Sequence, residues 1–172
     1  MSKLYIMMGL PGSGKSTFLQ NYVKPLDNSV IVSRDEIRFS LLKDGEDYFA
    51  HEEEVKNILW DTINEELSKG NNVYVDQTSL NKKSRALLLN HINLNNCEKI
   101  SIIWCDTALD CCLENNETRK DTKAYVPRGV IRRMMSQLEP PCFNEGFDCI
   151  YLYATYPDKI YKMEEGDSWY GE

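Results

Sequence analysis

The stretch Lys3-Leu4-Tyr5-Ile6-Met7-Met8, followed at once by Gly9-Leu10-Pro11-Gly12-Ser13-Gly14-Lys15-Ser16-Thr17, decides the fold. An apolar run leads into a glycine-rich turn with the spacing G-x-x-x-x-G-K-S, and a helical pattern follows. In this order the three segments predict a strand, a phosphate-binding loop (P-loop) and a helix. A chance glycine turn between a strand and a helix is the competing explanation. The motif and its context together argue against it.

The residue types of this loop fit a nucleoside triphosphate. Gly12 and Gly14 allow the backbone to bend, so that consecutive N–H groups point toward phosphate oxygens. A helix that begins near Lys15 adds the positive end of its dipole. The Lys15 ammonium can reach the β- and γ-phosphates, and the Ser16 hydroxyl can bind Mg²⁺. We therefore expect ATP and Mg²⁺ as cofactors, held by Gly9, Pro11, Gly12, Ser13, Gly14, Lys15, Ser16 and Thr17.

Length and composition narrow the remaining possibilities. A chain of 172 residues corresponds to one domain, which buries a sufficient core without disulfides. No apolar stretch is long enough to cross a membrane, and no signal-peptide pattern is present, so we expect a cytoplasmic protein. The six cysteines form no C-x-x-C pair, and with only two histidines we expect reduced thiols and no zinc. The net charge of −7 argues against a broad nucleic-acid-binding surface and leaves room for a local basic funnel.

Strand and helix patterns alternate along the chain, which predicts an α/β fold. We expect a single three-layer domain with a central five-stranded parallel sheet, helices on both faces and a helical lid. The domain should cover residues 1–163, with an acidic tail over 164–172. The predicted strands are 5–8, 30–33, 72–76, 100–105 and 149–153, and the predicted helices are 15–22, 35–42, 46–69, 82–93, 108–116, 127–138 and 157–164.

Four charged residues lie within five positions after the second predicted strand, at the sheet edge where ligands of such folds bind, and two of them are candidates for the site. Asp35 begins a helix, where it can act as an N-cap or as the general base that accepts the proton of an attacking hydroxyl. Arg38 is three residues later and shares the helix face of Asp35. It can hold an acceptor phosphate or form a surface ion pair. We interpret Asp35 as catalytic and Arg38 as substrate-binding.

The third predicted strand ends in Asp76, with Thr78 and Arg85 after it. A carboxylate at the end of an apolar strand can hold Mg²⁺ directly or through water. Asp76 can instead orient Arg38 or the acceptor, and the sequence does not separate these roles. Thr78 shapes the same mouth and is a candidate for substrate binding. Arg85 is a further candidate for substrate binding, although an arginine at the start of a helix is often solvated.

The polar stretch around 115–126 lies between two predicted helices and has the composition of a mobile lid. A lid arginine can close on the nucleotide and neutralise charge on the transferred phosphoryl group. Arg119 is the first candidate for catalysis and nucleotide binding, and Lys120 and Lys123 are weaker ones.

Together these segments resemble the kinase module of polynucleotide 5′-hydroxyl kinases, within the wider group of zeta-toxin-like P-loop kinases. The resemblance spans nearly the entire chain. It implies that Lys15 binds the phosphates, Ser16 binds Mg²⁺ and Asp35 activates the 5′-hydroxyl. It also implies that Arg38 contacts the phosphate next to the acceptor nucleoside, with Asp76 in support, and that Arg119 is the lid arginine. The resemblance is carried by the P-loop, by Ser33-Arg34-Asp35-Glu36-Ile37-Arg38, by Asp76-Gln77-Thr78-Ser79-Leu80-Asn81 with Arg85, by 116–119 leading to Val126-Pro127, and by 138–148.

The chain also departs from this group. The family lid usually carries a second arginine immediately before its asparagine, where this chain has Asn115. No D-x-D-G-T phosphatase signature is present. The acceptor therefore stays open between the 5′-hydroxyl of a DNA or RNA end and a small hydroxyl metabolite or nucleoside. A non-catalytic ATP-binding switch is a third possibility, for which Gln77 is the nearby residue able to position a water molecule.

Overall fold

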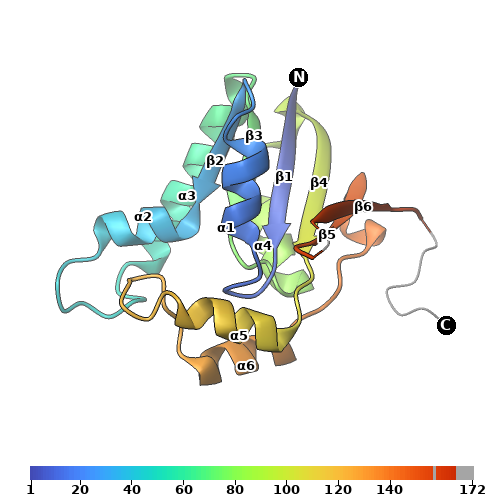
Figure 1. Ribbon diagram of the computed structural model, residues 1–172. Helices are drawn as coiled ribbons and strands as arrows, with labels where there is room; N and C mark the ends of the chain where they lie inside the picture. Colours follow the sequence, from blue (N-terminus) through green and yellow to red (C-terminus); the bar gives the residue numbers. More distant parts are fainter. Residues whose placement is uncertain (157, 166–172) are drawn as a thin grey trace.

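The computed structural model describes residues 1–156 and 158–165 as a three-layer α/β domain (Figure 1). Five strands form the predicted parallel sheet, and a sixth, antiparallel strand extends it at one edge. The order β2-β3-β1-β4-β5-β6 places the P-loop strand β1 between β3 and β4. The strands are β1 (Ser2–Met8), β2 (Ser29–Ser33), β3 (Asn72–Asp76), β4 (Cys97–Cys105), β5 (Cys149–Ala154) and β6 (Lys159–Met163).

Helices cover both faces of the sheet, so alternate residues of β1 face different layers. Leu4, Ile6 and Met8 belong to a core cluster with α3 and α4 residues. Met7 packs on the other face in a cluster with α1 and η1 residues. This alternation explains why the strand reads as a continuous apolar run. The helices are α1 (Lys15–Phe18), η1 (Leu19–Val23), α2 (Arg34–Leu41), α3 (Glu52–Ser68), α4 (Lys82–His91), η2 (Leu94–Asn96), α5 (Leu109–Glu117), α6 (Arg128–Ser136) and η3 (Phe143–Glu145).

The helix after the P-loop changes its winding after one turn. α1 continues directly into the π-helical turn η1, in which the Lys24 N–H donates to the Leu19 carbonyl over 2.9 Å. Phe18, Leu19 and Val23 remain buried against the sheet. The predicted helix over 15–22 is thus present as one continuous segment with a wider last turn.

α5 and α6 form a separate pair beyond the carboxyl ends of the strands, at the bottom of Figure 1. Leu113 of α5 and Ile131 of α6 pack with Leu10 of the P-loop and Leu80 after β3 in a third apolar cluster. The predicted lid segment between the two helices is therefore attached to the P-loop side of the sheet by apolar contacts.

Two predicted elements differ from the structure. Residues 159–163 form the edge strand β6, where we expected a helix over 157–164. The chain returns within four residues after β5, and Asp158 adopts a φ of 56° in that turn, so a hairpin forms. The helix expected over 46–69 begins only at Glu52, because the preceding residues form turns that include Gly45 at a φ of 82°. Residue 157 and the tail residues 166–172 lie outside the described residues.

Other expectations concern membranes and cysteines. None of the helices within the described residues is long and apolar enough to cross a membrane. All six cysteines are free thiols, and Cys105, Cys112 and Cys149 are buried.

Candidate active site

The P-loop runs from the end of β1 to the start of α1 at the carboxyl edge of the sheet. Gly12 and Gly14 have φ angles of 80° and 100°, a region that side chains with a Cβ rarely adopt. A Cβ at Gly12 would also meet the backbone carbonyl of Cys112 on α5. The loop is bound to the segment that follows β3, because the Gly9 N–H donates to the Thr78 carbonyl over 3.0 Å. Thr78 thus shapes the mouth through its backbone.

Lys15 turns back over the loop. Its ammonium donates to the carbonyls of Gly9 and Leu10, at 2.8 and 3.0 Å. Burial lowers the pKa of Lys15, and the neighbouring Asp76 carboxylate partly opposes that shift. An ammonium has three donors, so one remains for a ligand. The Ser13 hydroxyl is buried at the same loop with no hydrogen-bond partner among the described residues. These free donors and the bent glycine backbone fit an anionic phosphate.

Asp76 lies at the end of β3, opposite Ser33 of β2. Burial raises the pKa of Asp76, the Lys15 and Arg119 charges lower it, and the carboxylate of Asp35 raises it. The P-loop follows β1, Asp76 ends β3 and Asp35 lies in the first turn of α2 after β2, so these residues share one edge of the sheet. The charge of Arg119, from the predicted lid, acts on Lys15 and Asp76 there. Such a gathering can hold a triphosphate and place a carboxylate beside it.

Oxygen donors suitable for Mg²⁺ are present at this edge. Ser16 is exposed beside the loop, and Asp76 is partly buried. Mg²⁺ in proteins keeps several waters and takes one or two protein ligands together with substrate phosphates, so this sparse set fits it. Within residues 1–156 and 158–165, no three His, Cys, Asp or Glu side chains gather to hold a metal by themselves. Thr17 is exposed, next to Ser16.

α2 presents the candidate base. Its N-cap is Ser33, whose hydroxyl accepts from the Glu36 N–H over 3.3 Å. Asp35 is therefore not the cap, and its side chain is 55% exposed. Its Oδ1 accepts hydrogen bonds from the Arg38 guanidinium and from the Tyr48 hydroxyl, the latter over 2.7 Å. Within the described residues Oδ2 has no hydrogen-bond partner, so this oxygen is open to an acceptor hydroxyl.

Arg38 is buried, with its side chain only 6% exposed. Its Nη2 donates to both carboxylate oxygens of Glu52, at 3.0 and 2.9 Å, and Arg34 also donates to Glu52. Burial alone would raise the pKa of Glu52, but the hydrogen bonds from Arg38 and Arg34 outweigh it and lower the pKa. Arg38 is thus an internal ion-pair partner in this state, and an acceptor phosphate would have to share or replace Glu52.

The sequence analysis did not identify Glu52 or Tyr48 as functional residues. Tyr48 follows α2 in a turn region, and Glu52 begins α3. The signal for Glu52 was the acidic first turn Glu52-Glu53-Glu54 downstream of two arginines, because opposite charges on adjacent helices pair. The signal for Tyr48 was the aromatic pair Tyr48-Phe49 between charged residues. Neither signal indicates the partner, which depends on how α2 and α3 pack.

Hydrogen bonds from two asparagine side chains hold the base of the predicted lid segment. Asn116 is completely buried; its Nδ2 donates to the Val126 carbonyl over 2.6 Å, and its Oδ1 accepts from the Val126 N–H over 3.0 Å. Asn115 donates to the Gly12 carbonyl over 2.9 Å. The asparagine found where the family resemblance implies an arginine therefore links the lid to the P-loop. Arg119 is partly exposed, and its charge acts on Lys15 and Asp76.

Arg85 does not lie in the mouth, and the expectation that it binds substrate needs correction. Its side chain is completely buried, and it forms a two-point ion pair with Glu145, at 2.7 and 3.1 Å. Its remaining guanidinium nitrogen donates to the Ser79 carbonyl over 2.9 Å. The helix α4 directs this side chain inward, so its donors are consumed by the protein.

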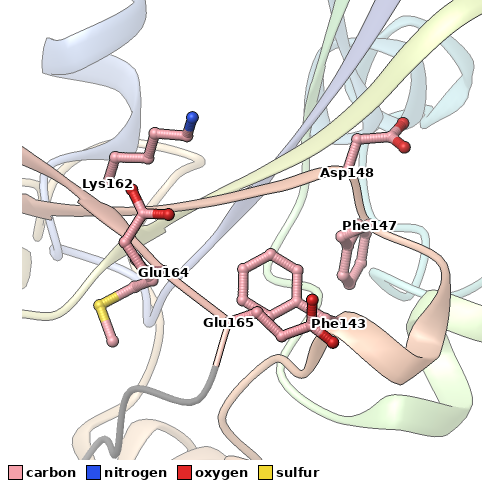
Figure 2. Close-up of a pocket in the computed structure, with 7 residues that line it drawn as sticks. Phe143, Phe147, Asp148, Lys162, Glu164 and Glu165 are labelled. Carbon is pink, nitrogen blue, oxygen red and sulfur yellow. The ribbon is translucent and has the colours of Figure 1, made fainter.

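A cavity of about 410 Å³ lies elsewhere, beside β6 (Figure 2). Its lining includes two phenylalanines and mixed charges, and it contains none of the residues predicted to bind or transfer phosphate. The residues that line it are Phe143, Phe147, Asp148, Lys162, Met163, Glu164 and Glu165.

Comparison with known proteins gives one similar sequence and two solved structures of similar fold. A protein of Acanthamoeba polyphaga mimivirus that bears the name bifunctional polynucleotide phosphatase/kinase is 27% identical over 161 residues, 91% of this chain and 34% of the relative. A chain of the Pnkp1/Rnl/Hen1 RNA repair complex has a TM-score of 0.71 at 24% identity, over 98% of this chain and 50% of its own length. A sugar kinase from Janibacter sp. HTCC2649 has a TM-score of 0.64 at 12% identity, over 90% and 86% of the two chains.

The chain spans about a third of the curated relative and half of the repair-complex chain. The two structures show the shared fold. A family of sequences described as an AAA domain (AAA_33) matches residues 4–141. Since this match covers most of the 172 residues, the chain belongs to the AAA_33 family and has its P-loop kinase fold.

Proposed function

We propose that this protein is an ATP-dependent phosphotransferase that moves the γ-phosphoryl group to the 5′-hydroxyl of a DNA or RNA end. The observation that carries the proposal is the gathering of Lys15, Asp35, Asp76 and Arg119 at one sheet edge. A nucleotide-binding loop and an unengaged carboxylate oxygen are the two parts that phosphoryl transfer requires. The name of the mimivirus relative supports a polynucleotide acceptor.

The proposed reaction is an in-line displacement. The acceptor oxygen attacks the γ-phosphorus, the bond from that phosphorus to the β,γ-bridging oxygen breaks, and ADP leaves. Asp35 Oδ2 accepts the proton of the attacking hydroxyl. Lys15 and Arg119 stabilise the negative charge on the phosphates. Mg²⁺ bound by the Ser16 hydroxyl, and by Asp76 directly or through water, would supply further positive charge there.

The acceptor side requires an exchange of partners. Arg38 has its Nη donors on Glu52, Asp35 and Tyr48. In the proposed complex the acceptor's nearest phosphate replaces part of the contact between Arg38 and Glu52. A phosphate can do so because, like a carboxylate, it is an anion that binds guanidinium in a two-point geometry. Asp76 supports the acceptor side from β3.

A small hydroxyl metabolite is the second candidate acceptor. The charges of Arg34 and Arg38 are balanced by Glu52 and Asp35 in this structure. Such a mouth has little excess positive charge for a polyanion, which favours a neutral acceptor. A non-catalytic switch has less support, because the side-chain oxygen of Gln77, its candidate for positioning water, is directed to Arg34 of α2, over 3.4 Å.

Label transfer from γ-³²P-ATP tests the proposal. We expect label on a 5′-hydroxyl oligonucleotide, Mg²⁺ dependence, and loss of transfer in Lys15→Ala. A 5′-phosphorylated oligonucleotide is the matched negative control. Transfer to sugars or nucleosides but to no oligonucleotide would establish the second candidate. Nucleotide binding without transfer to any hydroxyl would contradict both.

For the domain organisation, we propose a kinase domain over residues 1–163, with 115–126 as the lid. The closed Asn116–Val126 contact supports the lid boundary, because it brings the two ends of the segment together.

A further inference from the structure

An aromatic group lies beside the candidate base and comes from two parts of the chain. Phe39 is on α2, whereas Tyr48 and Phe49 lie in the turn region before α3. The Phe39 and Tyr48 rings are 6.3 Å apart, and the Tyr48 and Phe49 rings are 4.8 Å apart, edge to face at 88°. Phe39 is the one aromatic residue of α2 itself. The fold adds two more.

Tyr48 is already occupied in this group. The Arg38 guanidinium carbon lies 4.3 Å from the centre of its ring, and its hydroxyl is bound to Asp35 and Arg38. Burial and the Asp35 carboxylate raise the pKa of Tyr48, so its hydroxyl keeps the proton that it donates. Tyr48 therefore has its ring and its hydroxyl engaged by the protein.

Phe49 is different, because it is 64% exposed although it is a large apolar ring. The Arg38 guanidinium carbon is 6.0 Å from the centre of the Phe49 ring. An acceptor whose phosphate contacts Arg38 would thus bring its attached base within reach of Phe49. Exposed aromatic rings next to cationic side chains are the means by which proteins bind unpaired bases.

We propose that Phe49 is the stacking surface for a nucleobase of the acceptor, so that the phosphorylated hydroxyl belongs to a nucleoside unit rather than a sugar. This inference rests on the proposed phosphotransferase function and specifies its substrate class. Asp35 binds the hydroxyl, Arg38 the phosphate and Phe49 the base. An unpaired oligonucleotide end offers all three groups, and a free nucleoside offers the hydroxyl and the base.

The backbone that carries Phe49 is held before any ligand arrives. The Phe49 N–H donates to Asp47 Oδ1 over 2.9 Å, the Ala50 N–H donates to the Asp47 carbonyl over 3.0 Å, and the Tyr48 ring contacts the Phe49 ring edge to face. A backbone fixed in this way loses little conformational freedom on binding, which increases the affinity gained from stacking.

The experiment combines a protein variant with a substrate variant. Native protein, Phe49→Ala and Phe49→Trp are tested on a single-stranded 5′-hydroxyl oligonucleotide and on oligonucleotides with an abasic residue at the first or second position. Equilibrium binding with an ATP analogue present and steady-state label transfer are both measured. Tyr161→Ala, an exposed ring on β6 at the opposite edge of the sheet, is the matched control. Thermal unfolding of each variant verifies folding.

We expect Phe49→Ala to weaken acceptor binding and raise KM by about tenfold, with kcat within about twofold, as removal of one stacking ring predicts. With native protein, an abasic residue at one of the two positions should raise KM by the same factor. With Phe49→Ala, the abasic residue should raise KM no further. Phe49→Trp and Tyr161→Ala should behave as native protein. If label transfer to a free nucleoside depends on Phe49 in the same way, the nucleoside is the source of the base.

Other results would overturn the inference. If the effects of the abasic residue and of Phe49→Ala on KM multiply, or if neither change affects KM, Phe49 does not stack on the base. Label transfer to oligonucleotides would then still support the proposed function. If only base-free hydroxyl compounds are labelled, with rates independent of Phe49, the inference fails and a kinase function remains. If no hydroxyl compound is labelled and no oligonucleotide binds, both fail.

Discussion

In the proposed reaction the two oxygens of the Asp35 carboxylate have different roles. Arg38 and Tyr48 both donate to Oδ1, and Oδ2, which has no hydrogen-bond partner among the described residues, is the proposed base. Asp35→Asn keeps an oxygen for these donors but removes the base. We expect kcat to fall by about 10²- to 10⁴-fold with the affinity for an ATP analogue unchanged. Label transfer and analogue binding measure the two quantities.

The neighbouring carboxylate Glu36 provides the control for this substitution. It is exposed and, like Asp35, its charge acts on Asp76. Glu36→Gln should therefore leave kcat nearly unchanged if the proton transfer belongs to Asp35. An equal loss in both variants would mean that the local negative charge matters and that neither residue is the base.

Individual site residues could be predicted to different extents. Lys15, Asp35 and Asp76 follow directly from the ends of strands, because parallel strands bring their carboxyl ends to one edge. Glu52, Tyr48 and Phe49 could not be predicted, because they reach the site only through the packing of α2 on α3. Arg85 is of a residue type that is common in phosphate-binding sites. The direction of its side chain depends on the burial of α4, which the local sequence does not reveal.

Among the elements, the junction of α2 and α3 depends on one carboxylate. Glu52→Gln would leave the buried Arg38 with a weakened partner and Arg34 without its charged one. We expect the free energy of unfolding at pH 7 to fall by about 2 kcal/mol. Because the pKa of Glu52 is lowered in the folded protein, its stabilisation is complete above the ordinary value of 4.5 and is lost as the pH falls through the lowered value.

Urea unfolding of native protein and Glu52→Gln at a series of pH values checks this prediction. The difference between the two should be constant near neutral pH and shrink below pH 4.5. Glu53→Gln is the control on the same helix, since its carboxylate pairs only with Lys56 at the surface. A difference that is independent of pH would show that the Glu52 charge does not stabilise the junction.

The lid is a second element whose behaviour can be predicted. Asn116→Ala would leave the N–H and the carbonyl of Val126 without their side-chain partners. We expect a loss of about 2–3 kcal/mol and faster hydrogen exchange across residues 117–126. Turnover should also decrease, because Arg119 would lose the position from which the proposed reaction needs its charge.

Asn115→Ala serves as the comparison, because it removes only the contact to the Gly12 carbonyl. Its effect should be on nucleotide affinity, with exchange across the lid nearly unchanged. If Asn116→Ala left exchange over the lid as in native protein, the closed base of the lid would have no role in its order.

The element order could be predicted better than the element ends. The alternation of strands and helices identified five strands correctly, because buried parallel strands read as apolar runs between glycine or polar turns. β6 was missed because Lys159-Ile160-Tyr161-Lys162-Met163 is short, charged and almost entirely exposed. An edge strand with little burial has no hydrophobic pattern, and only its hydrogen bonds to β5 define it.

At the scale of the whole molecule, Arg85 of α4 connects the turn just before its own helix to Glu145 of η3, which lies 60 residues later in the chain. It pairs with Glu145 near η3 and binds the Ser79 carbonyl after β3, while Glu145 also accepts from the Cys142 N–H over 2.8 Å. Ser79 has a φ of 47°, so this turn needs an external partner to hold it. The ion pair is therefore expected to stabilise the domain and not to bind substrate.

A double-mutant cycle tests this role. Arg85→Met and Glu145→Gln should each lower the free energy of unfolding by about 3–5 kcal/mol, because each leaves the other charge buried without its counter-ion. The double variant should lose less than the sum, since it contains no unpaired charge. Below their unfolding temperatures, both single variants should retain the native KM for the acceptor. If Arg85→Met unfolded like native protein and raised KM instead, Arg85 would belong to the acceptor site after all, and the buried conformation would have to open when substrate binds.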